Sequence, residues 1–368
     1  MSYTGPSAPS VVPLRPKSRA RSAQKAPLTP RPGGGRLRRP KGYCGRTWHI
    51  PIKHLNSENW LVKKLFPGTL LEFEHWFRTE EACRDYLSKL RWPQGFECAR
   101  CHHGAAWRTA RGLYRCTHCK TGVSLTAGTI FDHSRIPLRT WFRAAWWITN
   151  QKSGVSALGL QRLLGLGSYE TAWTCLHKLR RAMVRPDREQ LTGPVEIDET
   201  FVGGLSRRNS SRYTKAFVII AAEIRGEGIG RIRLSQLPDD TEPSVREFIL
   251  KTVAAGSKLV TDGAHAYKHL KPYGYGHQRH VVKYCLPGRD MAHRKLPRAH
   301  RIASLLKRWL LGVHQGRISK QQLDHYLEEF AFRFNRRFSP QRGMLFYRLL
   351  QQSVRVQPAP YRTIIHRG

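Results

Sequence analysis

The alternation of apolar and polar residues is clearest at residues 195–202, where it predicts a β-strand with one buried face. The polar positions of this strand are Glu196, Asp198 and Thr200. Aspartate is uncommon in strands and costly to bury without a partner, so Asp198 in mid-strand indicates a specific role. A solvent-facing Asp on an open sheet is the alternative that the pattern alone leaves in place.

The pattern that follows predicts an α/β domain. Two strands over residues 215–224 and 229–237 come first, followed by a helix over residues 243–254. Two further strands over residues 258–262 and 277–284 come next, and a helix begins near residue 300. Gly226 and Gly228 mark a hairpin, so the first three strands of the domain should be antiparallel. This order is typical of a ribonuclease H-like fold, in which helices flank a mixed sheet.

Two Cys-x-x-Cys pairs predict a zinc ribbon, which a helix over residues 70–90 precedes. Their spacing brings four thiolates to the corners of a tetrahedron, and a cysteine site with no open position is structural. Two disulfides in a secreted protein are the alternative, which the lack of an apolar signal-peptide region disfavours. The predicted ligands of this structural Zn²⁺ are Cys98, Cys101, Cys116 and Cys119.

Residues 154–184 predict two helices joined by a glycine-containing turn. The first helix covers residues 156–164, and Ser168 suits the N-cap of the second. A basic second helix after such a turn is typical of proteins that read the DNA major groove, whereas an ordinary helical hairpin with a solvated basic face is the alternative. The candidate DNA contacts are Lys178, Arg180 and Arg181.

The charge balance points to a polyanionic partner. The chain of 368 residues has 64 Lys and Arg against 25 Asp and Glu, a formal net charge of +39. Such an excess repels itself unless it is neutralised, which favours nucleic acid over a membrane because no apolar run is long enough to span a bilayer. Residues 1–43 hold ten Lys and Arg, no acid and many prolines, which predicts a disordered arm that contacts phosphates. A transit peptide is the weaker alternative.

Four segments share a further pattern of acids, glycines and basic-aromatic runs. They are residues 196–204, 261–267, 300–312 and 326–337. Together with the cysteine pairs, they resemble the motifs of bacterial DDE-type insertion-sequence transposases that carry a zinc ribbon ahead of a ribonuclease H-like catalytic domain. The resemblance covers roughly residues 70–350. It implies a cytoplasmic, nucleoid-associated enzyme that binds double-stranded DNA, acts as a homo-oligomer and has no membrane partner.

The resemblance also implies a carboxylate site for Mg²⁺ or Mn²⁺. Two such ions activate the attacking oxygen and stabilise the leaving 3′ oxygen in DNA cleavage and strand transfer. Asp198 and Asp262 are the candidate catalytic ligands, because the first and fourth strands of a ribonuclease H-like sheet are neighbours. Glu196 shares a strand face with Asp198 and is a candidate auxiliary. Glu199 lies on the other face and is expected to be a structural neighbour.

The position expected to hold a third ligand is a leucine. The resemblance places a Glu or Asn five residues after His300, at Leu305. No Asp or Glu occurs between Asp290 and Asp324 to take over this role on the same helix. The chain is therefore catalytically impaired or recruits another group, for which the candidates are His300, Glu196 and Glu328.

Basic residues around the same helix are candidate phosphate contacts. The main ones are Lys307 and Arg308, with Arg294, Lys295, Arg298 and Arg301 nearby. In the last helices, Glu328 and Glu329 are expected to pair with arginines of residues 333–337.

The sequence predicts five segments. Residues 1–43 form a disordered basic arm, residues 70–135 a zinc ribbon with a flanking helix, and residues 136–190 a helical DNA-binding segment. Residues 191–350 form a ribonuclease H-like transposase domain, and residues 351–368 a loose basic tail. The predicted function of the chain is DNA transposition. A catalytically impaired or repurposed transposase that only binds DNA is the competing hypothesis, which Leu305 favours. A zinc-ribbon transcription or repair factor is less favoured, because it gives the two aspartates no purpose.

If the leucine impairs catalysis, Leu305→Asn or Leu305→Glu will increase metal-dependent DNA cleavage over that of the unaltered chain. The physical reason is that both side chains offer an oxygen to the metal, whereas leucine offers none. The measurement is nicking of DNA in the presence of Mg²⁺ or Mn²⁺. Equal nicking by all three proteins would contradict the impairment hypothesis.

Overall fold

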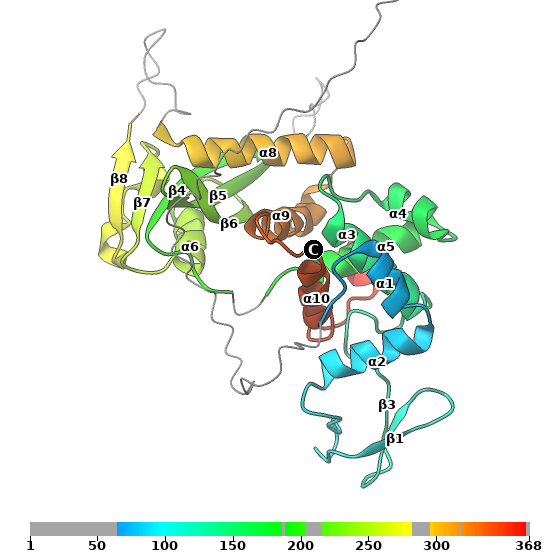
Figure 1. Cartoon of the computed structure of the whole chain (residues 1–368). Helices are drawn as coiled ribbons and strands as arrows, with labels where there is room; N and C mark the ends of the chain where they lie inside the picture. Colours follow the sequence, from blue (N-terminus) through cyan, green and yellow to red (C-terminus); the bar gives the residue numbers. More distant parts are fainter. Residues whose placement is uncertain (1–64, 186–187, 204–214, 282–294, 317, 366–368) are drawn as a thin grey trace, which may run out of the picture. The chain divides into compact units, whose positions relative to one another are not determined.

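The computed structural model describes residues 65–185, 188–203, 215–281, 295–316 and 318–365 (Figure 1). The basic arm predicted for residues 1–43 lies outside them, as do Arg294 and the end of the strand predicted for residues 277–284.

The helix predicted over residues 70–90 is present as two helices, α1 (Leu70–Trp76) and α2 (Glu80–Arg91). The break falls at Thr79, whose backbone is extended. Its side chain accepts a hydrogen bond from the backbone N–H of Ala82 and so caps α2. Threonine competes for backbone hydrogen bonds in this way, so it begins a second helix where apolar periodicity alone predicted a continuous one.

The predicted ribbon is a three-stranded antiparallel sheet of β1 (Ala106–Arg108), β2 (Tyr114–Cys116) and β3 (Gly122–Val123). After it come α3 (Leu138–Asn150), α4 (Ala157–Leu164) and α5 (Tyr169–Ala182). The side chains of Ser156 and Ser168 cap α4 and α5, and Gly165 ends α4 in the left-handed conformation at φ 62°. The structure thus confirms the two predicted helices and their turn.

One apolar core unites α1 to α5 with a helix from the far end of the chain. That helix is α10 (Arg342–Ser353), whose Phe346 is fully buried among Phe73, Phe77 and Phe142. A side-chain carbon at Gly343 would collide with the carbonyl group of Pro67, so the first turn of α10 requires glycine. The transposase domain predicted over residues 191–350 therefore does not include α10, because this helix packs in the first core.

The second core is built around a five-stranded mixed sheet. Its strands are β4 (Pro194–Val202), β5 (Ala216–Arg225), β6 (Gly228–Leu237), β7 (Lys258–Asp262) and β8 (Gly276–His280), in the spatial order β6-β5-β4-β7-β8. β4, β5 and β6 are antiparallel, whereas β7 and β8 run parallel to β4. This is the arrangement of a ribonuclease H-like sheet, as predicted.

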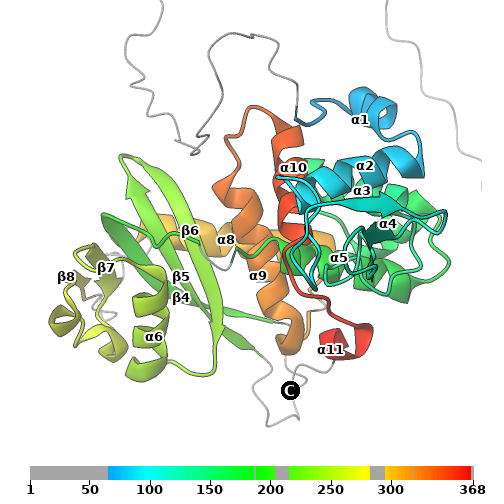
Figure 2. The ribbon, with the colours of Figure 1, turned by 90° about the horizontal axis from the view of Figure 1, so that it is seen from below.

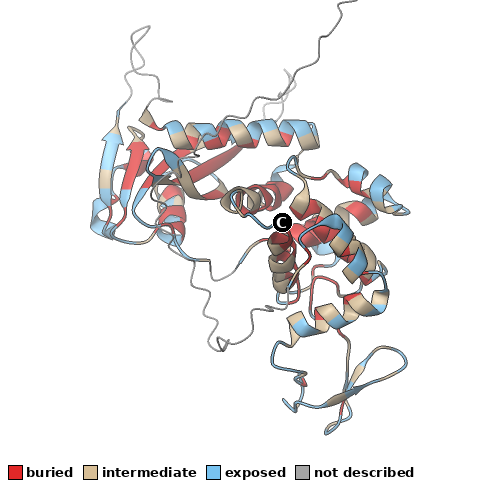
Figure 3. Ribbon diagram, viewed as in Figure 1, coloured by how far each residue is buried: buried red, intermediate tan, exposed pale blue. Residues whose placement is uncertain are grey.

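Helices cover both faces of this sheet, with α6 (Glu242–Thr252) on one and α8 (Pro297–His314) on the other (Figure 2). Buried residues concentrate in β4, β5 and β7, whereas β8 at the sheet edge is largely exposed (Figure 3). The alternation along β4 explains the two cores. Val195 and Ile197 pack on the α6 side, whereas Val202 packs on the α8 side.

Helix α9 (Lys320–Asn335) lies along the other edge strand, β6. The Asn335 side chain accepts from the N–H of Ile232 at 2.7 Å and donates to its C=O at 3.1 Å, and Asp324 accepts from the N–H of Gln236 at 3.1 Å. These bonds satisfy backbone groups that an edge strand would otherwise expose, which protects β6 from pairing with another chain.

The same helix is joined to α5 by a buried ion pair. Arg180 Nε lies 2.7 Å from Glu329 Oε2, with the two side chains 1% and 0% exposed. Arg333 lies within 3.8 Å of Glu329 and also donates to the C=O groups of Ile148 and Gln151, which end α3. The expected pairing of Glu329 with Arg333 is thus present, but Arg180 is its closer partner.

This burial corrects part of the predicted DNA-binding set. Arg180 is occupied by Glu329, and Lys178 is only 6% exposed and donates to the C=O of Asp132. Neither cation is at the surface, because the basic residues of α5 serve to pack it against α9 and the segment before α3. Arg181 is half-buried.

The predicted loose tail over residues 351–368 is also corrected. α10 continues to Ser353, and a short helix, α11 (Tyr361–Ile365), follows. Ile364 is 1% exposed, and its C=O accepts a hydrogen bond from the Gln322 side chain. Buried apolar residues, among them Ala359 and Ile364, therefore dock the tail, which its basic composition did not reveal.

We predict that Glu329→Gln will lower the free energy of unfolding by about 3–5 kcal/mol, because it leaves the buried Arg180 charge without a counter-ion. The neighbouring Glu328→Gln is the matched control. Its partner Arg188 is 29% exposed, so the loss should be about 1 kcal/mol or less. Urea unfolding of the three proteins measures both values, and similar losses in the two variants would contradict the assignment.

Candidate active site and zinc centre

The pairing of β4 with β7 brings the two predicted catalytic aspartates together. The paired residues Val195 and Leu259, like Glu196 and Val260, are 64 positions apart, and each aspartate follows the last of these pairs by two residues on its own strand. Asp262 ends β7, where its Oδ1 accepts a hydrogen bond from the N–H of Ala264 at 2.9 Å. The two carboxylates are close enough for the charge on Asp262 to raise the pKa of Asp198.

Asp198 is buried under α8 and is only 9% exposed. Loss of hydration, with the charges of Asp262 and Glu196, raises its pKa to about 6, although a backbone hydrogen bond from Glu199 and the charge of Lys307 oppose the shift. A nearby cation would stabilise the ionised form of such a carboxylate, and this environment is typical of a metal ligand.

Glu196 is not available as the predicted auxiliary ligand. Its Oε2 accepts from the N–H groups of Arg298 and Ala299, at 2.7 and 2.9 Å, and its Oε1 lies 2.9 Å from Arg298 Nη1. The carboxylate thus caps the N-terminus of α8, where Leu296 provides no side-chain cap, and complements the helix dipole.

Arg298 is likewise occupied and does not serve as a phosphate contact. Besides Glu196, its guanidinium donates to the C=O groups of Gly226 and Gly228 in the β5–β6 hairpin. The sequence suggested a DNA contact because the residue is basic and near the site. Its actual partners are backbone groups that only the folded sheet brings within reach.

His300 is the residue of α8 that faces Asp198. Its Nε2 is 3.5 Å from Asp198 Oδ2, is itself buried and has no hydrogen-bond partner among the described residues. Burial lowers the pKa of His300, which favours the neutral imidazole. Of the three predicted substitutes for the third ligand, Glu196 caps α8 and Glu328 pairs with Arg188 at 2.7 Å, so only His300 lies at the carboxylates without such a partner.

Leu305 is half-buried and packs against the apolar cluster formed by β4, β5, β6, α8 and α9. The predicted apolar face of this helix is therefore present, with Ile302, Leu306 and Leu310 fully buried in the same cluster. A leucine at position 305 extends this core contact, so nothing in the packing requires a polar group there.

The other face of β4 holds a contact that the sequence did not predict. Tyr267, in the 3-10 turn His265–Tyr267, donates its hydroxyl hydrogen bond to Glu199 Oε2 at 2.6 Å. Burial, together with the charges of Asp262 and Asp198, raises the pKa of Glu199 to about 7. This bond ties the segment after Asp262 to the residue after Asp198. The available signal was Tyr267 itself, at the end of the 261–267 motif.

Basic side chains remain exposed next to this site. Lys307 and Arg308 project from the solvent face of α8, and Arg301 is exposed about two turns earlier. These three retain the position expected of phosphate contacts.

The four cysteines of the ribbon gather into one cluster. Their sulfur atoms all lie within 4.8 Å of one another, with Cys98 to Cys119 and Cys101 to Cys116 at 3.6 Å. Sulfurs bound to one tetrahedral Zn²⁺ with bonds of about 2.3 Å are roughly 3.8 Å apart, so the donor set fits zinc. Over the described ranges, this is the one group of three or more candidate ligands gathered so closely.

The two cysteine pairs form equivalent turns. The N–H of His102 donates to the C=O of Cys98, and that of Lys120 donates to Cys116, at 2.9 and 3.2 Å. Both donors have φ near +60°, which is uncommon for residues with a side chain. The matching geometry indicates that both knuckles are shaped to present two sulfurs to one ion.

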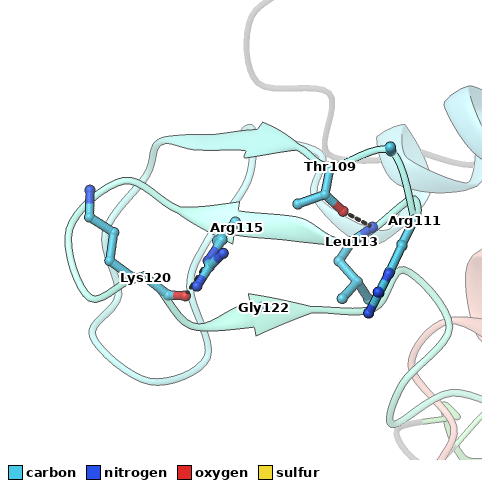
Figure 4. Close-up of a pocket in the computed structure, with 7 residues that line it drawn as sticks. Thr109, Arg111, Leu113, Arg115, Lys120 and Gly122 are labelled. Carbon is cyan, nitrogen blue, oxygen red and sulfur yellow. Dashed lines mark hydrogen bonds between the residues drawn. The ribbon is translucent and has the colours of Figure 1, made fainter.

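A hollow of about 490 Å³ opens on the ribbon, lined by Arg111, Arg115, Lys120 and Gly122 among others and by no acid (Figure 4). Exposed Trp107 lies opposite Arg115 on the adjacent strand, and the Lys120 ammonium is 5.1 Å from its ring centroid. Sequence reasoning did not single out these residues, although aromatic and basic residues alternate along β1 and β2.

None of the described helices is long and apolar enough to cross a membrane.

Comparison with known proteins finds a match for each of the two domains. Residues 190–335 match the ISXO2-like transposase domain, and residues 78–122 match the transposase zinc-ribbon domain. The first match ends before α10, as the packing does. A relative, described as an uncharacterized protein in transposable element ISH50 of Halobacterium salinarum, is 28% identical over 284 residues. This alignment covers 70% of the present chain and 91% of the relative.

The fold, the cysteine cluster and these matches define a transposase of the DDE type with a zinc ribbon ahead of a ribonuclease H-like domain. Within that class, residues 190–335 resemble the ISXO2-like transposase domain.

The raised pKa of Asp198 gives a testable dependence of stability on pH. The carboxyl has a pKa of about 6 in the folded chain against 3.8 when unperturbed, so the folded state disfavours its ionised form. Stability therefore falls as pH rises from about 4 through about 6, by at most about 3 kcal/mol. Asp198→Asn cannot ionise, and we expect it to be more stable than the unaltered chain at pH about 8 but not at pH about 4.

The measurement is urea unfolding without added Mg²⁺ or Mn²⁺ and without chelator, which would also remove zinc. Asp85→Asn, at an exposed acid on α2, is the control and should show no such difference. An Asp198→Asn variant that gains nothing at the higher pH would show that Asp198 is not penalised by burial.

Proposed function

We propose that this chain cleaves DNA at the ends of an insertion sequence and joins them to a new site, with Asp198 and Asp262 as metal ligands. The observation that carries the proposal is the pairing of β4 with β7, which sets the two aspartates side by side beneath the N-terminal half of α8. Bound Mg²⁺ or Mn²⁺ supplies the positive charge that activates an attacking oxygen and stabilises a leaving one.

In cleavage, the oxygen of a water forms a bond to phosphorus while the bond to the 3′ oxygen breaks, and the 3′ oxygen leaves as a hydroxyl. In strand transfer, that hydroxyl is the attacking group and loses its proton as it bonds to a phosphorus of the target, while the bond from this phosphorus to the target's 3′ oxygen breaks and that oxygen leaves as a hydroxyl. Asp198 and Asp262 would hold the metal ions for both steps, and exposed Lys307 and Arg308 would orient the phosphates.

DNA recognition would fall on two surfaces. On the ribbon, Arg111, Arg115 and Lys120 surround a hollow without acids, which suits the phosphate backbone. In the α4–α5 pair, the buried C-terminal half of α5 leaves its first residues exposed, including Tyr169 and Glu170. The N-terminal residues of a recognition helix are the ones that contact bases, so base reading would come from this turn.

A transposase that binds DNA without cutting it is the second candidate. The specific observation in its favour is Leu305, whose side chain packs into the apolar cluster and offers no ligand atom. Structural zinc and both DNA-contacting surfaces would serve this function equally well.

We predict that the unaltered chain will nick DNA that carries the sequences flanking its gene when Mg²⁺ or Mn²⁺ is added. Asp198→Asn will abolish nicking but retain DNA binding, because the substitution removes a metal ligand far from the ribbon and the α4–α5 turn. Asp85→Asn is the control and should nick normally. Binding without nicking by all three proteins would support the DNA-binding candidate instead.

A further inference from the structure

We infer that His300 supplies the third metal ligand of the Asp198–Asp262 site, in place of the carboxylate or amide that position 305 lacks. The inference rests on the proposed function. It concerns which atom completes the site, and it predicts a different preference between metals from that of an all-oxygen site.

The first support is the geometry of His300. Its Nε2 is 3.5 Å from Asp198 Oδ2. Two ligands on adjacent corners of an octahedron with bonds of about 2.1 Å are roughly 3 Å apart, so both atoms can bind one ion after a small adjustment. Asp262 would also have to turn toward them, because these three residues are not gathered as closely as the four cysteines.

The second support is the state of the Nε2 atom. It is buried and, within the described part of the chain, has no hydrogen-bond partner. A buried polar atom without a partner is costly. A metal ion between His300 and Asp198 would satisfy both groups.

The third support is the placement of α8. Glu196 holds the backbone N–H groups of Arg298 and Ala299, which fixes the first turn of the helix at the level of the carboxylates. His300 follows directly in this fixed turn. Position 305 is five residues further, about 7.5 Å along the helix axis, and lies in the apolar cluster.

The imidazole ligand has a chemical consequence. Imidazole nitrogen is a softer ligand than carboxylate oxygen and suits transition metals, whereas Mg²⁺ prefers oxygen. A site with one imidazole should therefore bind Mn²⁺ in clear preference to Mg²⁺.

The experiment is a Mn²⁺ titration, followed by electron paramagnetic resonance, of the zinc-loaded full chain. The proteins are the unaltered chain, His300→Ala, Asp198→Asn and His269→Ala. His269 is an exposed histidine that pairs with Glu242 and serves as the matched control. We expect the Mn²⁺ affinity to fall on the order of 10- to 100-fold in His300→Ala and Asp198→Asn, and to stay unchanged in His269→Ala.

A spectroscopic signature separates a ligand from a residue that only orients Asp198. Electron spin-echo modulation of the bound Mn²⁺ should show coupling to a histidine nitrogen in the unaltered chain and in His269→Ala. In His300→Glu, affinity should be retained without the nitrogen signal, and Mg²⁺ should bind more nearly as well as Mn²⁺.

The outcomes distinguish the two proposals. Loss of affinity in Asp198→Asn without any nitrogen coupling in the unaltered chain would overturn the assignment of His300 and leave the proposed carboxylate site standing. Unchanged affinity in Asp198→Asn would overturn the carboxylate site itself, and the assignment of His300 with it.

Discussion

The contact between Glu196 and the first turn of α8 is the interaction on which the site depends. A carboxylate that is nearly fully buried on β4 accepts the free N–H groups of Arg298 and Ala299, and the guanidinium of Arg298 neutralises it. Without this cap, the helix would begin with unsatisfied donors over an apolar sheet. With it, α8 has one axial position, in which His300 meets Asp198 and Ile302 and Leu306 complete the core.

Helix α9 plays the corresponding role between the two cores. Along one side it satisfies backbone groups of edge strand β6 through Asn335 and Asp324, and along another it buries Glu329 against Arg180 of α5. The chain then returns through α10 to the helices that precede the sheet in sequence. The α4–α5 pair is thus fixed to the sheet domain by a buried ion pair as well as by apolar packing. These contacts also hold the exposed turn of the pair in place.

This arrangement accounts for how the chain tolerates a leucine at position 305, where the resemblance places a metal ligand. Position 305 faces an apolar cluster on one side. A leucine there lacks the side-chain oxygen of Glu or Asn, but it adds apolar contact with this cluster. The two aspartates do not depend on α8 for their mutual position, because β4 and β7 set it through backbone hydrogen bonds. The proposed site on paired strands therefore keeps two of its candidate ligands when the helix above it changes.

The sequence by itself determined the elements and the local chemistry. Alternation and periodicity predicted every strand of the mixed sheet. The spacing of the two cysteine pairs predicted the zinc ligands, and the 64-residue spacing of Asp198 and Asp262 predicted that they lie on neighbouring strands. The tertiary structure alone decided which charged groups face each other. The basic residues Lys178, Arg180 and Arg298 looked like DNA contacts, yet they are occupied by Asp132, Glu329 and Glu196. Glu196 and Arg298 are partners 102 positions apart in sequence, Glu199 and Tyr267 are 68 positions apart, and Arg180 and Glu329 are 149 positions apart. The physical reason is that a charged side chain has no periodicity that reveals its partner, because the partner is set by burial and by which distant segments the fold brings within about 3 Å.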